Sequence, residues 1–141
     1  MFQPCGIYAA MMTPYTESGE LNLPEAQRLT EFFIQSGVDG IFPVSNVGGK
    51  VQLTQEEKKR FSDTVVRRTD GRVAVTPGIT GAGTRESVEL GRYCKEAGAD
   101  AVVLSAPYYF PYPREIVLDG MRGVIAQLPL PVILYHIPKY T

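Results

Sequence analysis

Five short apolar runs recur along the chain, and between them apolar residues return every three or four positions. Four of the runs are rich in β-branched and aliphatic residues and do not alternate with polar ones. Runs of this kind are typical of strands buried on both faces of a parallel sheet. The first run is less regular. The expected strands cover 6–12, 40–44, 73–77, 101–105 and 131–135.

The segments between these runs carry the start and stop signals of four helices. The signals are the capping residues Asn22, Thr54 and Thr84, the first-turn proline Pro113, and the closing glycines Gly37 and Gly98. Strand and helix therefore alternate, with a strand about every thirty residues, which is the spacing of right-handed βαβ crossovers. The pattern predicts a single α/β architecture that ends on a fifth strand.

Composition narrows the possible classes of protein. The chain has 141 residues, of which 44% are hydrophobic and 21% charged, with a net charge of −1. These values are typical of a soluble globular domain and argue against nucleic-acid or membrane partners. Two cysteines, Cys5 and Cys94, and one histidine, His136, exclude a zinc finger and argue against a disulfide scaffold. We expect a cytoplasmic protein.

Candidate chemistry lies in the loops after the strands, because ligands of parallel α/β folds bind beyond the carboxyl ends of the strands. The loop 45–50 offers a serine, an asparagine, two glycines and a lysine, so its backbone N–H groups could hold a carboxylate or phosphate. On the loop alone, an ordinary glycine-rich connection with a solvated Lys50 is the favoured interpretation. The loop 78–84 fails both the dinucleotide and the P-loop pattern, and Thr84 is expected to be a helix cap.

Tyrosines follow the last two expected strands. The segment 106–113 contains four aromatic residues and three prolines, and could present phenol groups to a substrate or pack at a subunit interface. Tyr135 ends the fifth strand. It could relay protons if a neighbouring charge lowers the pKa of its phenol from about 10.

Taken together, these fragments resemble the dihydrodipicolinate synthase and N-acetylneuraminate lyase family, the Schiff-base-forming class I aldolases on a (β/α)8 barrel. The resemblance covers essentially the whole chain in order. It rests on Met12-Thr13-Pro14-Tyr15, Gly37-Val38-Asp39-Gly40-Ile41, the loop 45–49 with Leu53-Thr54-Gln55-Glu56-Glu57, Val75-Thr76-Pro77-Gly78, Gly98-Ala99-Asp100-Ala101, Pro107-Tyr108-Tyr109 and Leu134-Tyr135-His136-Ile137-Pro138.

The resemblance implies roles for individual residues. Tyr135 matches the tyrosine that shuttles protons during Schiff-base formation, and Tyr109 matches a second tyrosine of the relay, which in the synthases crosses a dimer interface. The loop residues Ser45, Asn46, Val47 and Gly48 match the segment that binds the carboxylate of a 2-keto acid such as pyruvate. The family uses no cofactor or metal, and its members assemble as homo-oligomers, dimers or tetramers.

Several positions depart from the family pattern. Asn46 and Val47 replace hydroxyl-bearing residues of the loop, although Val47 can still donate its backbone N–H. Tyr140 stands where the synthases place an arginine for the carboxylate of the aldehyde, and a phenol cannot make that bidentate contact; Tyr140 could also be a simple packing residue. The departures favour a related aldolase or lyase with another acceptor aldehyde over a strict 4-hydroxy-tetrahydrodipicolinate synthase.

The nucleophile of the family is a lysine on the sixth strand, and residues 1–141 are expected to stop before it. A (β/α)8 barrel needs about 250 residues, so the sequence predicts the N-terminal part of a barrel, with about five strands and four helices. By resemblance this is a pyruvate-dependent carbon–carbon lyase whose 141 residues alone are inactive. The alternatives are a non-catalytic half-barrel that acts through a partner and, less favoured by the failed glycine patterns, a small phosphate-binding domain.

Overall fold

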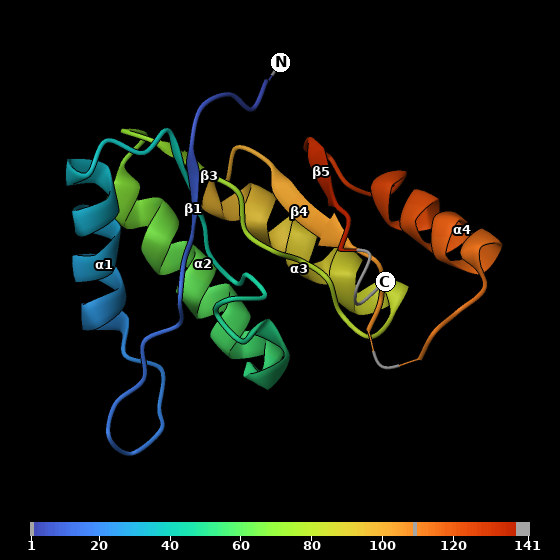
Figure 1. The fold of residues 1–141 in the computed structure, drawn as a ribbon, viewed down its shortest axis with the longest axis horizontal. Coiled ribbons are helices and arrows are strands. Elements are labelled where there is room, and N and C mark those ends of the chain that lie inside the picture. Colours follow the sequence, from blue (N-terminus) through green and yellow to red (C-terminus); the bar gives the residue numbers. More distant parts are fainter. Residues whose placement is uncertain (1, 109, 138–141) are drawn as a thin grey trace.

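The computed structural model describes residues 2–108 and 110–137, in which strands and helices alternate as expected (Figure 1). The elements in chain order are β1 (Tyr8–Ala10), α1 (Leu23–Gln35), β2 (Gly40–Phe42), the short 3₁₀ helix η1 (Lys50–Gln52), α2 (Gln55–Thr69), β3 (Ala74–Val75), α3 (Thr84–Ala97), β4 (Val102–Ser105), α4 (Arg114–Ile125) and β5 (Val132–Tyr135). The five predicted strands and four predicted helices are confirmed, and η1 is an addition.

The strands pair in parallel and in chain order. β1, β2 and β3 form one ladder and β4 and β5 a second. A parallel bridge between Gly78 and Val103 joins the two ladders just beyond the end of β3. This order, with each strand beside its sequence neighbour, is that of consecutive strands in a (β/α)8 barrel.

The strands are shorter than the apolar runs that predict them. β2 ends before Pro43, and β3 ends shortly before Pro77, because proline has no N–H to donate to the ladder. Parallel hydrogen bonding nevertheless continues past the end of β3, where the Thr76 N–H donates to the Ile41 carbonyl and the Gly78 N–H to the Pro43 carbonyl. The carboxyl ends of β2 and β3 are therefore held together up to the loops.

The helices pack in sequence, α1 on α2, α2 on α3 and α3 on α4, and follow the strands along the molecule in Figure 1. Two apolar clusters fill the space between sheet and helices. The first contains Met11, Leu21, Ala26, Ile41, Val44, Leu53, Phe61, Val65 and Val75. The second contains Ile79, Val88, Leu90, Cys94, Ala99, Val102, Leu104, Val124 and Leu130. Of the helices in the described ranges, none is long and apolar enough to cross a membrane.

The helix caps follow the sequence signals with two exceptions. Asn22 accepts the Glu25 N–H, and Thr54 and Glu57 form the expected capping box. Thr84, however, is the first helical residue of α3, and Gly83 is its cap. The side chains of Glu86 and Ser87 accept the N–H groups of the two residues before Gly83, which leaves Thr84 inside the helix. Pro113 likewise caps α4 rather than lying in its first turn.

Candidate active site

The loop after β2 is tied to the end of β1 by two hydroxyl groups. Thr13 Oγ1 donates to the Gly48 carbonyl at 2.7 Å, and Ser45 Oγ donates to the Met11 carbonyl at 3.0 Å. Ser45 Oγ also accepts the Gly48 N–H at 3.0 Å. Ser45 is buried, with 1% of its surface exposed. Its role is therefore to fix the conformation of the loop, because both hydrogen-bonding functions of its hydroxyl are used inside the protein.

Close backbone contacts add to this rigidity. A Cβ on Gly48 would lie 2.6 Å from the Met11 carbonyl oxygen, and a Cβ on Gly78 would lie 2.3 Å from the Val44 carbonyl oxygen. Val44 itself has a φ of 55°, which is rare and costly for a β-branched residue. Strained residues of this kind cluster at functional sites, where the surrounding structure holds them in place. The loop 45–50 thus has the character of a preformed site.

Two N–H groups remain available on this loop. In the hydrogen bonds of the described residues, the backbone N–H groups of Asn46 and Val47 have no protein acceptor. Both residues are exposed, Val47 by 66%. Neighbouring free N–H groups on a fixed turn can bind an anion such as a carboxylate. The N–H groups of Asn46 and Val47 are thus available to an anion, and Asn46 also carries a side-chain amide that can donate.

Tyr135 reaches back across the sheet toward this loop. It is the last residue of β5, and its ring packs edge-on against that of Phe42 with ring centres 6.0 Å apart. Phe42 ends β2, three residues before Ser45. The structure thus brings Tyr135 to the strand that leads into the loop 45–48. Tyr135 is 42% exposed. The other predicted site residues, Tyr109 and Tyr140, lie outside the described residues.

Lys50 is a site residue that the sequence does not reveal. Only 8% of its surface is exposed, so the interpretation of a solvated lysine is wrong. Its Nζ donates to Ser105 Oγ at 3.0 Å, and Ser105 Oγ lies 3.1 Å from Thr80 Oγ1. Burial, reinforced by the positive charge of Lys58, lowers the pKa of Lys50 to about 8. A buried amine therefore lies among hydroxyls at the carboxyl ends of β3 and β4.

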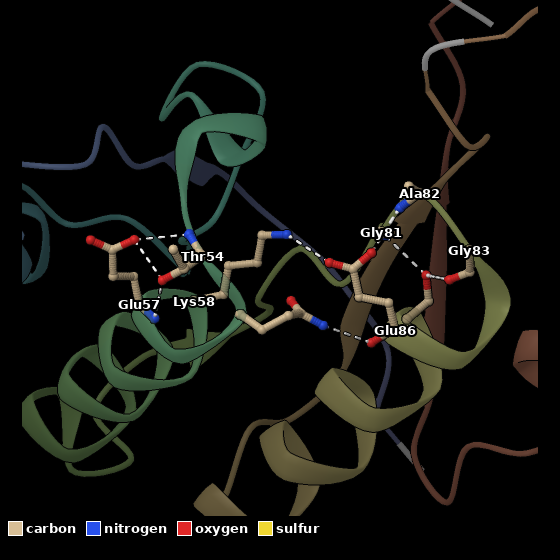
Figure 2. Close-up of polar contacts among 9 residues, drawn as sticks. Thr54, Glu57, Lys58, Gly81, Ala82, Gly83 and Glu86 are labelled. Carbon is tan, nitrogen blue, oxygen red and sulfur yellow. Dashed lines mark hydrogen bonds and ion pairs between the residues drawn. The ribbon is translucent and has the colours of Figure 1, made fainter.

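The loop after β3 is fastened from outside by Glu86, as Figure 2 shows. One carboxylate oxygen of Glu86 accepts the Ala82 N–H at 3.0 Å, and the other lies 3.5 Å from Nζ of Lys58 on α2. Gln55 adds a hydrogen bond from its amide to the Glu86 carbonyl at 3.2 Å. The side chain of Lys58 is 3% exposed and that of Glu86 is 32% exposed, and the ion pair joins α2 to α3. Removing Glu86 would leave the buried charge of Lys58 uncompensated.

A cavity of about 170 Å³ opens between the loop after β3 and α4. Its lining includes Thr80 and Ser105, the two hydroxyl residues next to Lys50, together with Tyr112 and Met121. The described part of the chain holds no group of three His, Cys, Asp or Glu side chains that could bind a metal ion. The polar groups near the site include backbone N–H groups, hydroxyls and amines, which suit a small anionic or carbonyl ligand.

Parallel strands in barrel order, with polar loops gathered at their carboxyl ends, define an enzyme-like (β/α) barrel segment. Residues 3–141 match the model of the dihydrodipicolinate synthetase family, and the chain belongs to that family. It is 35% identical over 136 residues to the 4-hydroxy-tetrahydrodipicolinate synthase of Nitratidesulfovibrio vulgaris, covering 96% of this chain and 46% of that protein.

Solved structures agree with this assignment. The dihydrodipicolinate synthase of Aquifex aeolicus superposes with a TM-score of 0.91 at 32% identity, over 96% of this chain and 46% of that one. YagE of Escherichia coli K12, solved in complex with pyruvate, gives a TM-score of 0.91 at 34% identity over the same shares. The chain thus spans about half the length of the relatives it matches, and it corresponds to the N-terminal part of their barrels.

Proposed function

We propose that residues 1–141 are the N-terminal part of a pyruvate-dependent aldolase or lyase that forms or cleaves a carbon–carbon bond through a lysine Schiff base. The observation that carries the proposal is the fixed loop 45–48, in which the N–H groups of the exposed residues Asn46 and Val47 have no acceptor among the described residues. Family membership supports it, since the relatives are synthases and aldolases and YagE was solved with pyruvate. The lysine itself belongs to the half of the barrel that these residues do not include.

In this proposal different residues bind the carboxylate, hold the loop and transfer protons. The N–H groups of Asn46 and Val47 bind the carboxylate of pyruvate, and Ser45 keeps them in place through its bond to Gly48. Tyr135 moves protons: it donates one to the departing carbonyl oxygen as the imine forms, and it later takes one from or returns one to the reacting carbon atom. Tyr109 continues this relay, from a partner subunit in a homo-oligomer.

The acceptor aldehyde follows from Tyr140. Because a phenol offers one hydrogen bond where an arginine offers a charged pair, we propose an aldehyde without a carboxylate at that position. A strict 4-hydroxy-tetrahydrodipicolinate synthase is then the less favoured assignment within the family. Two free cysteines, Cys5 and Cys94, suit the reducing cytoplasm that we propose as its location.

Trapping of the imine tests the proposal. The full gene product is incubated with pyruvate and borohydride, digested, and mapped by mass spectrometry. We expect a reduced pyruvate adduct on one lysine, and none when 2-propanol replaces pyruvate. Absence of any lysine adduct from an active, folded preparation would contradict the assignment.

A half-barrel that acts through a partner is the second candidate. The observation in its favour is the outer edge at β5, where Leu134 is 59% exposed at the end of the sheet. Size-exclusion chromatography with hydrogen exchange on the 141-residue chain distinguishes the two. A well-protected monomer would argue against dependence on a partner.

A further inference from the structure

Two lysines are buried near the ends of β2 and β4, and they differ in their partners. Lys58 faces the carboxylate of Glu86. Lys50 faces the neutral hydroxyl of Ser105, and in the described residues no carboxylate oxygen lies within 4.0 Å of its amine. The charge that acts on Lys50 is that of Lys58, which is positive. An ammonium group at Lys50 is therefore poorly compensated, whereas an anion there would be attracted to Lys58.

We propose that Lys50 is a site of reversible carbamylation, in which its amine combines with CO₂ to form an N-carboxylate. The nitrogen lone pair of the uncharged amine attacks the carbon of CO₂, and one C=O electron pair moves onto oxygen. The nitrogen then releases one proton to solvent. Amine and CO₂ thus give a carbamate anion and a proton, with no oxidant, reductant or leaving group.

The surroundings provide donors for the carbamate oxygens. Ser105 Oγ accepts a hydrogen bond from the Lys50 amine at 3.0 Å and lies 3.1 Å from Thr80 Oγ1, and the bond that it donates to the Ala106 carbonyl is long at 3.3 Å. The Ser105 hydroxyl can therefore turn toward the carbamate at little cost. Thr80 Oγ1, 3.1 Å from Ser105 Oγ, supplies a second hydroxyl near the amine.

The state of the amine favours the same reaction. With a pKa of about 8, Lys50 holds roughly a hundredfold more uncharged amine near pH 7.5 than an ordinary lysine does. CO₂ is small and uncharged, so it can enter a buried site that excludes larger electrophiles. Lys50 adjoins the cavity of about 170 Å³ through Ser105 and Thr80, which both line it. A switch of charge from positive to negative would thereby occur beside the candidate active site.

The test uses the 141-residue chain with ¹³C-bicarbonate near pH 8. A carbamate signal is recorded by ¹³C NMR, and triethyloxonium ion then traps the carbamate as an ethyl ester for peptide mapping. Mapping separates Lys50 from the α-amino group, which also carbamylates. We expect at least tenfold higher occupancy at Lys50 than at Lys59. The side chain of Lys59 is 29% exposed and forms an ion pair with Glu56.

Three variants test whether the carbamate forms on Lys50. Lys50→Arg removes the lysine signal, while Lys59→Arg leaves it, and Lys58→Met lowers occupancy several-fold because it removes the cation that attracts the carbamate. Equal labelling of Lys50 and Lys59 in the folded wild-type chain, or a signal that survives Lys50→Arg, would overturn the proposal. Labelling in the wild-type chain is decisive even if Lys50→Arg fails to fold. None of these outcomes depends on pyruvate, so they are independent of the proposed function.

Discussion

The two sides of the candidate site are built differently. On the side of β1 and β2, the loop 45–50 is held by buried hydroxyls, close backbone contacts and a strained Val44. On the side of β5, Tyr135 is 42% exposed and rests on Phe42 through one ring contact. The first side is fixed by the fold of the described residues themselves. On the second side, Tyr135 is held by the pairing of β5 with β4, and the only ring contact of its side chain among the described residues is with Phe42.

Because of this difference, substitutions on the two sides should have different effects on stability and on the reaction. Substitutions on the loop side should change folding and ligand binding together, because the same hydroxyls serve both. Substitutions at Tyr135 should change the reaction and leave folding unaltered, since an exposed phenol contributes little to the core.

Tyr135→Phe keeps the ring on Phe42 and removes only the hydroxyl. In the full gene product we expect turnover to fall by about 10²–10⁴, the usual contribution of a positioned acid or base. The free energy of unfolding of the 141-residue chain, in which Tyr135 is 42% exposed, should change by less than about 0.5 kcal/mol. Steady-state kinetics and urea denaturation measure the two quantities. Unchanged turnover would remove Tyr135 from the relay.

Gly78→Ala tests the close approach of β3 to the turn at Val44. The added Cβ would lie 2.3 Å from the Val44 carbonyl oxygen, so the backbone must shift. We expect the free energy of unfolding to fall by about 2–4 kcal/mol in urea. Gly120→Ala is the matched control, since nothing lies within 4 Å of its added Cβ in α4, and it should gain up to about 1 kcal/mol. Equal behaviour of the two variants would refute the tight contact.

The titration of Lys50 gives a pH-dependent signature. Its pKa is about 8 in the folded chain and about 10.4 in the unfolded one, so between these values the unfolded state binds more protons. Stability of the wild-type chain relative to Lys50→Met should therefore rise with pH from 8 to 10.4, by up to about 3 kcal/mol, and be level below pH 8. Denaturation midpoints across this range measure it. If the stability of both proteins changes equally with pH, the pKa of Lys50 is not lowered.

Ser45→Ala probes the smallest of these effects. The Gly48 N–H loses its acceptor inside the protein, which costs about 1–3 kcal/mol of unfolding free energy. Ser36→Ala removes an exposed hydroxyl that donates to the Phe32 carbonyl, and should cost less than about 0.5 kcal/mol. If the two alanine variants lose the same stability, Ser45 does not organise the loop.

Sequence pattern was sufficient for the order of strands and helices, and it marked the loop 45–48 as a candidate site. Hydrophobic periodicity and capping residues are local signals. Once the strands are located, the candidate site follows, because ligands of parallel α/β folds bind beyond the carboxyl ends of the strands. The burial of Lys50 could not be predicted, because it depends on Ser105, fifty-five residues away. The same holds for the pair of Lys58 and Glu86. The cap of α3 was predicted wrongly at Thr84, since Glu86 and Ser87 reach back over the loop.

The central claim is that the loop 45–48 holds the carboxylate of a 2-keto acid. Titration of the ¹⁵N-labelled 141-residue chain with pyruvate tests it most directly, with acetone as the ligand that lacks the carboxylate. We expect the largest amide shifts at Asn46 and Val47 with pyruvate, and none there with acetone. The claim would be contradicted if pyruvate shifted other amide signals but not those of Asn46 and Val47, or if acetone shifted these two signals equally.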